Sequence, residues 1–368
     1  SALLGMCTKF SEVTLAVHFH ETNAEGDRVG GPMYYIKNGL KKHWHWLAYL
    51  FAAFGVLTVF GTGNATQVNT ITTAIDSALF NYGIIEKDSV GTLNLIIGIV
   101  LAILIGMILL GGIKRIGQVT EKLVPIMAAL FLVGSLVLLA ARIKYIPATF
   151  GMIFRYAFQP QAIIGGSVGA ALKIALTQGA KRGLFSNEAG MGSTPHAHAL
   201  ANVKSPHEQG CVAMIGVFID TFVVLTLNAL VVISTLYTSD GILANGYTGA
   251  VTEVVDKTNL TQTAFGLVFG EQIGAVFIAI TLFFFAFSTI LGWNLFGKIN
   301  VAYLFGEKAT KVYTILALIF IFLGTLASND LVWELSDMSN NLMVIPNALA
   351  LFALTGMVQA AMKRVKKL

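Results

Sequence analysis

The residues best suited to chemistry lie where a long apolar run is interrupted, in the segment Gly179–Pro195. Asn187 and Glu188 stand inside this interruption, and an ionisable residue in an apolar run is a functional-site hypothesis by default. The glycines around them permit the chain to unwind, and Pro195 suits the first turn of a restarting helix. The start of such a half-helix attracts a carboxylate, and the Asn187 amide can both donate and accept. The alternative is a re-entrant loop with only a packing role.

A second interruption is the segment Phe60–Asn69, which combines glycine with amide side chains. Gly61 and Gly63 allow a close approach of another helix, while Asn64 and Gln67 place polar groups on neighbouring turns. We interpret this segment as a candidate part of a transport site. The alternative for both amides is a packing seam of small residues with hydrogen bonds between helices.

A third group of polar residues lies in the apolar segment Phe287–Asn294. Ser288 and Thr289 are adjacent hydroxyls, and oxygen atoms are the ligands that a small hard cation such as sodium requires. Trp293 follows Thr289 by four residues, which puts it on the same helical face, where it can close one side of a small pocket. The alternative is that both hydroxyls hydrogen-bond to their own helix.

The composition decides which environment holds these residues. Hydrophobic residues make up 55% of the chain and charged residues only 12%, whereas a soluble domain carries about 25% charged residues. This excludes a water-soluble enzyme, a nucleic-acid-binding protein and a disordered chain. Since no catalytic triad, phosphate loop or paired acid and base is evident, we expect a membrane protein that is not an enzyme.

A membrane-spanning helix needs about 20 mainly apolar residues. Such runs predict one partial and eight full spans, at Ser1–Phe19, Trp46–Asn69, Leu93–Leu110, Leu123–Ala141, Gly169–Ala201, Cys211–Leu236, Ile273–Phe296, Val312–Ala327 and Leu331–Met362. Two connections, Pro147–Gly166 and Thr261–Phe269, predict short helices at the membrane surface and over the outer mouth. No linker or low-complexity tract is evident, so we expect a single transmembrane domain, residues 1–368.

Lysine and arginine are concentrated in alternate connections between these spans, and the group at the C-terminus, Lys363–Lys367, belongs to the richer set. Basic residues accumulate in cytoplasmic connections during membrane insertion. The pattern therefore predicts a multi-pass protein of the cell membrane with its C-terminus in the cytoplasm.

Short motifs along the whole chain carry a resemblance to a known family. They are Gly30-Gly-Pro-Met-Tyr-Tyr-Ile, Gly61-Thr-Gly-Asn-Ala-Thr-Gln67, Gly111-Gly-Ile-Lys-Arg-Ile-Gly117, Arg182-Gly-Leu-Phe-Ser-Asn-Glu-Ala-Gly-Met-Gly192, Gly292-Trp-Asn294 and Met343-Val-Ile-Pro-Asn347. In these motifs the chain resembles the sodium-coupled alanine/glycine symporter family. The resemblance implies an all-α helix bundle with a LeuT-like inverted repeat and discontinuous helices.

On this comparison the chain begins at the end of core helix 2 and retains core helices 3–10, so that core helix 1 is expected upstream. The resemblance also implies two sets of site residues. The substrate-binding residues are Gln67, Phe185, Asn187 and Trp293, and the sodium ligands are Ser288 and Thr289.

The function that follows is sodium-coupled symport of a small neutral amino acid, alanine or glycine, into the cell by alternating access. Two alternatives are a proton-coupled symporter that uses Glu188 and a membrane sensor that binds an amino acid without moving it. The expected partners are the amino acid, sodium and the lipid bilayer, without nucleic acid. Because core helix 1 completes both sites, we expect the isolated 368-residue chain to insert but to bind no alanine.

Overall fold

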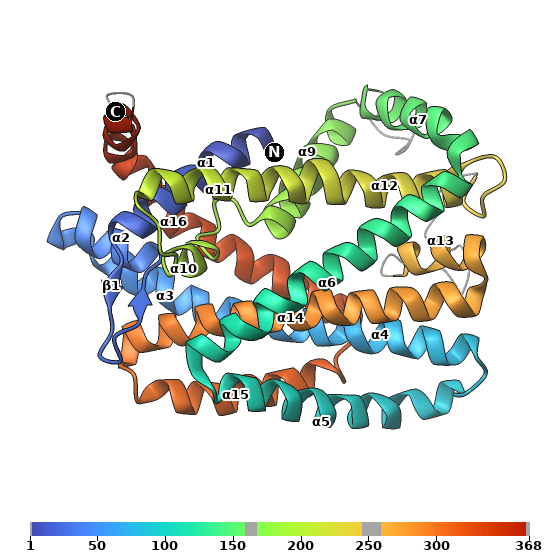
Figure 1. Ribbon diagram of the computed structural model, residues 1–368, viewed down its shortest axis with the longest axis horizontal. Helices are drawn as coiled ribbons and strands as arrows, with labels where there is room; N and C mark the ends of the chain where they lie inside the picture. Colours follow the sequence, from blue (N-terminus) through green and yellow to red (C-terminus); the bar gives the residue numbers. More distant parts are fainter. Residues whose placement is uncertain (1, 159–167, 245–258, 366–368) are drawn as a thin grey trace.

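The computed structural model describes residues 2–158, 168–244 and 259–365, and most of them are helical (Figure 1). The first half contains α1 (Ala2–His18), β1 (Glu21–Thr22), β2 (Arg28–Val29), α2 (Pro32–Gly39), η1 (Lys42–Trp44), α3 (Trp46–Thr58), η2 (Val59–Ala65), α4 (Thr66–Asn81), η3 (Lys87–Ser89), α5 (Val90–Leu109), α6 (Gly112–Ala141), η4 (Ile143–Tyr145) and α7 (Ile146–Phe158). The second half contains α9 (Val168–Asn187), α10 (Pro195–His198), α11 (Pro206–Phe218), η5 (Ile219–Leu225), α12 (Thr226–Val232), η6 (Ile233–Tyr237), α13 (Leu260–Phe269), α14 (Glu271–Phe305), α15 (Ala309–Gly324) and α16 (Asn329–Val365).

Within the described residues, six helical rods are long and apolar enough to cross a membrane. They are Lys42–Asn81, Val90–Leu109, Gly112–Ala141, Pro206–Tyr237, Glu271–Phe305 and Asn329–Met362. The expected span at Val312–Ala327 is the shorter apolar helix α15, and the expected span at Gly169–Ala201 is divided after Asn187. The chain is therefore a polytopic helical membrane protein.

The two predicted connection helices are present as α7 and α13. Helix α13 approaches α14 so closely that a Cβ on Gly274 would lie 2.4 Å from the Gly266 nitrogen. Glycine at this crossing is thus required by the contact between the two backbones. The end of the predicted surface stretch, residues 159–166, lies outside the described residues.

The segment Phe60–Asn69 does not unwind. Elements α3, η2 and α4 form one continuous rod, and η2 is a π-helical turn within it. A π-turn leaves carbonyl groups without their usual partners. The Thr66 hydroxyl donates to the Gly61 carbonyl at 3.3 Å, and the Gln67 amide donates to the Thr62 carbonyl at 3.1 Å. Polar side chains in this segment therefore support an irregular helix without breaking it.

The polar residues of Phe287–Asn294 do not interrupt their helix either, because α14 runs from Glu271 to Phe305. Half of the residues in its most apolar stretch are buried inside the protein, whereas only 11% are buried in the corresponding stretch of the rod Pro206–Tyr237. Helix α14 is thus an inner helix, whereas α11 and α12 expose most of their surface. A helix that is apolar on all sides is expected at the centre of a bundle.

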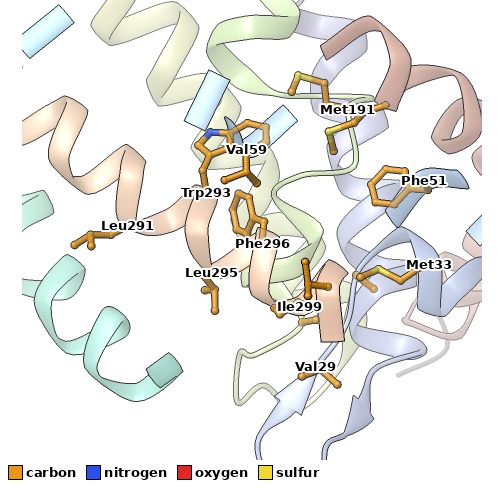
Figure 2. Close-up of a cluster of buried hydrophobic side chains, with 14 of the residues drawn as sticks. Val29, Met33, Phe51, Val59, Met191, Leu291, Trp293, Leu295, Phe296 and Ile299 are labelled. Atoms are coloured by element: carbon orange, nitrogen blue, oxygen red, sulfur yellow. The ribbon is translucent and has the colours of Figure 1, made fainter. Parts of the chain in front are cut away.

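A large hydrophobic cluster surrounds the inner part of α14, and Figure 2 shows its members from several elements. Trp293 and Phe296 of α14 meet Val59 of η2 and Phe51 of α3, and Met191 joins them from the segment after α9. The centres of the Trp293 and Phe296 rings are 5.6 Å apart and the ring planes are inclined at 63°, an edge-to-face arrangement that aromatic rings favour. The interrupted segment is therefore packed into the core and does not project from it.

The connections separate to the two ends of the bundle, as Figure 1 shows. The β1–β2 hairpin, α2 and the end of α16 lie at one end, and α7 and α13 lie at the other. The basic connections between α5 and α6 and between α14 and α15 also belong to the first end. This arrangement agrees with the alternation predicted from the charges.

At the α7 end, Arg142 connects the end of α6 to the segment after η6. Its guanidinium donates to both carboxylate oxygens of Asp240, at 2.7 and 2.8 Å, and to the Ser234 carbonyl at 2.7 Å. It also lies 3.8 Å from the centre of the Tyr145 ring. The hydrogen bonds from Arg142 hold the pKa of Asp240 below its ordinary value.

We predict that Asp240→Asn lowers the unfolding temperature of the purified protein at pH 7, because the bidentate contact with Arg142 is lost. An exposed ion pair contributes about 0.2–1 kcal/mol, so the shift will be small. A depressed carboxylate pKa stabilises the fold above the unfolded-state pKa, and this stabilisation fades as the pH falls. The difference between wild type and variant, measured by thermal unfolding, should narrow below about pH 4. Asp88→Asn, a change of another exposed carboxylate, should show no such narrowing.

Candidate functional site

The predicted interruption at Gly179–Pro195 is confirmed only in its later part, because residues 179–187 continue α9 and residues 188–194 form a break between two helices. Helix α9 ends at Asn187 and α10 begins at Pro195. Between them the backbone adopts positive φ at Glu188 (55°), Gly190 (94°) and Gly192 (79°). Glycine takes this conformation without strain, whereas Glu188 does so at a cost of about 1–3 kcal/mol. Backbone strain at the start of such a break supports the hypothesis of a functional site.

The exposed backbone donors of this break are bonded by a carboxylate of the protein itself. Glu12 of α1 accepts hydrogen bonds through one oxygen from the Gly190 and Gly192 N–H groups, at 3.1 and 3.0 Å. The same oxygen accepts from the Asn347 amide of α16 at 2.5 Å. Glu12 is fully buried. The Glu12 carboxylate is therefore the anion that these N–H groups bind. Helix α10 has only four residues, so the expected half-helix whose start would attract a substrate carboxylate is not formed.

A buried lysine accompanies this carboxylate. Lys9 of α1 lies 4.0 Å from the second oxygen of Glu12 and donates to the Thr194 hydroxyl at 2.7 Å. Thr194 and Ser193 both donate to Glu188, at 3.0 and 2.5 Å. Lys9 thus lies near Glu12 and is linked to Glu188 through Thr194, so both charged residues of α1 contact the segment between α9 and α10. Buried charges are tolerated only when they are paired and hydrogen-bonded in this way.

Asn187 shapes the start of the break. Its carbonyl oxygen accepts from the Ala189 N–H at 3.0 Å, and its amide donates to Thr221 of η5 at 3.3 Å. The preceding Ser186 hydroxyl contacts both oxygens of Asp220, at 3.0 and 2.8 Å. Asp220 of η5 is thus hydrogen-bonded to the end of α9. A direct contact of Asn187 with substrate stays a prediction.

Phe185 lies on the last turns of α9, where α9 meets α16. Its ring is 5.1 Å from that of Trp333, and the Arg182 guanidinium lies 4.9 Å from the same Trp333 ring. Arg182 and Lys181 also approach the Asp337 carboxylate, at 3.3 and 3.8 Å. Aromatic and ionic contacts therefore join the two helices beside the break.

Trp293 and Gln67 belong to a separate part of the structure, where α14 crosses η2 and α4. A Cβ on Gly63 would lie 2.5 Å from the Trp293 Cβ, so glycine permits this crossing. Asn64 accepts from the Asn294 amide at 2.7 Å, and Asn294 accepts from Tyr313 at 2.9 Å. The interhelical hydrogen bond expected as the alternative for Asn64 is therefore present, while Gln67 remains half-buried beside it.

The two hydroxyls predicted to bind sodium point along their own helix. Ser288 and Thr289 both donate to the Phe285 carbonyl, at 2.9 and 2.8 Å. Ser288 also lies 3.4 Å from the Met127 sulfur of α6. This is the hydrogen bonding expected as the alternative. A hydroxyl that donates its proton still carries two acceptor lone pairs, so a cation role for these oxygens stays a prediction.

The structure brings together four residues that sequence reasoning did not assign to the site. Lys9, Glu12, Tyr35 and Asn347 come from three helices, and the Tyr35 hydroxyl donates to the Asn347 carbonyl oxygen. A signal was present, because Lys9 and Glu12 are charged residues three apart in a largely apolar segment. Their partners lie far along the chain, because Glu12 accepts from Gly192, 180 residues away, and Lys9 donates to Thr194, 185 residues away.

Comparison with known proteins agrees with this architecture. The pattern of the sodium:alanine symporter family matches residues 1–367. The chain is 39% identical to the sodium/alanine symporter AgcS of Methanococcus maripaludis over 365 residues, covering 99% of the chain and 75% of AgcS. It is 38% identical to an uncharacterized transporter of Haemophilus influenzae, covering 96% of the chain and 72% of that protein.

A third relative is the amino-acid carrier protein AlsT of Bacillus subtilis. It is 32% identical over 370 residues, covering 100% of the chain and 72% of AlsT. The family pattern and these relatives extend over the α9 break, the α14 crossing and the ends of the described chain alike. The chain belongs to the sodium:alanine symporter family.

Proposed function

We propose that this protein moves a small neutral amino acid, alanine or glycine, into the cell together with sodium. Membership of a symporter family establishes an amino-acid transporter. The preferred substrate, sodium as the coupling ion and the inward direction are our proposal. It is supported by AgcS, a relative whose name assigns it sodium and alanine.

The break between α9 and α10 is the observation that carries this proposal. A non-helical backbone at membrane depth is tolerated only where it is buried in protein or lines a water-filled cavity. Discontinuous helices in transporters supply their free backbone groups to substrates and ions near the middle of the membrane. Here Glu12 occupies the N–H groups of Gly190 and Gly192. The substrate would therefore use the backbone and side chains on the helix side of the break, around Phe185 and Asn187.

In the proposed site, Gln67 and Trp293 would contact the substrate from α4 and α14, and Phe185 and Asn187 would contact it from the end of α9. The oxygens of Ser288 and Thr289 would contribute to sodium binding on α14. Movement of one sodium charge inward gains about 2.3 kcal/mol per 100 mV, which is enough to accumulate a neutral amino acid. With the C-terminus in the cytoplasm, the basic end of the bundle would face the cytoplasm, where the amino acid and sodium would be released.

Uptake measurements test this function directly. Proteoliposomes containing the complete protein should accumulate labelled alanine when sodium is outside, and should stop when choline replaces sodium at a fixed pH. Uptake that continues in choline and follows an inward proton gradient would contradict sodium coupling in favour of proton coupling. Saturable alanine binding without any uptake would contradict transport and indicate a sensor.

We predict that Glu12→Ala destabilises the protein strongly, whereas Glu12→Gln folds. Alanine leaves the Gly190 and Gly192 N–H groups and the Asn347 amide without their acceptor, at about 1–3 kcal/mol for each buried group. Glutamine keeps the oxygen that accepts these three hydrogen bonds, while it removes the charge and replaces the second oxygen, 4.0 Å from Lys9, with an amide NH2 group. Thermal unfolding of the purified variants compares the two changes.

A matched control is Thr14→Val on the same helix, which removes a buried hydroxyl that has no hydrogen-bond partner among the described residues. It should leave the unfolding temperature nearly unchanged. If Glu12→Gln is as unstable as Glu12→Ala, the charge near Lys9 is the essential contribution, and the account given for the break is wrong.

Replacement of Thr289 by Val tests the sodium site, because valine keeps the shape and removes the oxygen. We predict a higher half-saturating sodium concentration for uptake. Linkage then requires weaker alanine binding at limiting sodium and near-normal binding at saturating sodium. Thr281→Val is the control, since Thr281 makes the same 2.8 Å hydrogen bond to its own helix, with Phe277. An equal loss at every sodium concentration would speak against a cation role for Thr289.

A further inference from the structure

A cavity of about 450 Å³ opens at the end of the bundle that holds the β1–β2 hairpin. The hairpin, the turn between α5 and α6, the last turns of α14 and the start of α15 surround it, and Figure 1 shows these elements gathered there. This volume is in the range of small-molecule sites. None of the predicted site residues lines this cavity.

The lining of this cavity carries two positive and two negative side chains. Lys298 of α14 and Lys311 of α15 supply the positive charges, and Glu25 of the hairpin and Glu307 supply the negative ones. Among the described residues, no ion pair joins any of these four groups. Lys298 instead donates to the Leu109 carbonyl at 2.5 Å, at the last turn of α5. Charges of both signs are therefore presented to the cavity without neutralising one another.

One wall of the cavity is apolar and continues onto the outer surface of the bundle. Leu110 and Ile315 line the cavity and are 79% and 61% exposed, and Leu318 lies one turn further along α15. Exposed leucine and isoleucine on membrane-spanning helices face lipid chains. The cavity thus has a polar end with charges of both signs and an apolar side open to the bilayer.

We propose that this cavity binds a membrane phospholipid whose headgroup carries a phosphate and a primary ammonium, as in phosphatidylethanolamine. The phosphate would contact Lys298 and Lys311, and the ammonium would donate to Glu25 and Glu307. Basic pockets between membrane helices commonly hold lipid phosphates. The two carboxylates add a preference for a zwitterion, because an anionic headgroup would face them without compensation.

The lipid chains would follow Leu110, Ile315 and Leu318 toward the bilayer. This apolar wall is the reason to choose a lipid over a soluble zwitterion such as a free amino acid, which has nothing to place against it. A choline headgroup would fit the charges less well, because its methylated nitrogen cannot donate hydrogen bonds to the carboxylates. The inference is independent of the substrate and the coupling ion proposed above.

Native mass spectrometry of the purified chain tests the proposal. The protein is exchanged into equal amounts of phosphatidylethanolamine, phosphatidylcholine and phosphatidylglycerol, and the lipid retained is measured. We expect phosphatidylethanolamine to be preferred. Lys298→Met should reduce its retention about tenfold, the effect of losing one charge-assisted hydrogen bond. Lys311→Met at the more exposed rim provides a second variant that does not alter a partly buried position.

Two further changes separate the possible ligands. The double change Glu25→Gln and Glu307→Gln should lower the retention of phosphatidylethanolamine to that of phosphatidylcholine. Lys308→Met, a change of an exposed lysine that does not line the cavity, should have no effect. Circular dichroism and thermal unfolding confirm that each variant is folded.

Equal retention of the three lipids, or retention unchanged in Lys298→Met and Lys311→Met, would overturn the proposal. A preference for phosphatidylglycerol that depends on Lys298 would show an anion site instead of a zwitterion site. Displacement of the bound lipid by millimolar phosphoethanolamine or alanine would show that the soluble headgroup chemistry is sufficient, which also contradicts a lipid site.

Discussion

A helix that is broken inside a membrane exposes backbone N–H groups, and the hydrocarbon offers no water to bond them. Each such group left unsatisfied costs several kcal/mol. In this protein Glu12 supplies the acceptor for two of them, and it is held by Asn347, which is in turn bonded by Tyr35. One buried carboxylate therefore connects α1, the break, α16 and α2.

This arrangement has a consequence for movement. The break can change shape only if the hydrogen bonds to Glu12 move with it or are exchanged for others, because an unpaired buried charge is strongly unfavourable. Helices α1 and α16 are thus coupled to the backbone of the break. On the other side of α9, Arg182 and Phe185 contact α16 through Asp337 and Trp333. A shift of α9 relative to α16 would therefore alter these contacts together with the hydrogen bonds to Glu12.

The other helices of the bundle pack closely around this region. Helix α14 is continuous and half-buried, and the glycines Gly63 and Gly274 allow close contacts between α14 and its neighbours. Between membrane helices, close packing and interhelical hydrogen bonds replace the hydrophobic effect as the source of association. The Asn64–Asn294–Tyr313 hydrogen bonds are interhelical bonds of this kind, and they connect η2, α14 and α15.

The sequence alone determined the class of the protein, its apolar helices and the break around Asn187, because apolar run length and glycine placement are local properties. The concentration of basic residues in alternate connections also indicated that successive connections lie at opposite ends of the bundle. The sequence did not determine that the polar residues near Gln67 and Ser288 would leave their helices continuous, since side chains can satisfy the backbone locally. Only the tertiary structure decided which acceptor the break uses. Glu12 and Gly192 are 180 residues apart, and nothing in either local sequence specifies the other, so their pairing depends on how α1 packs against the break.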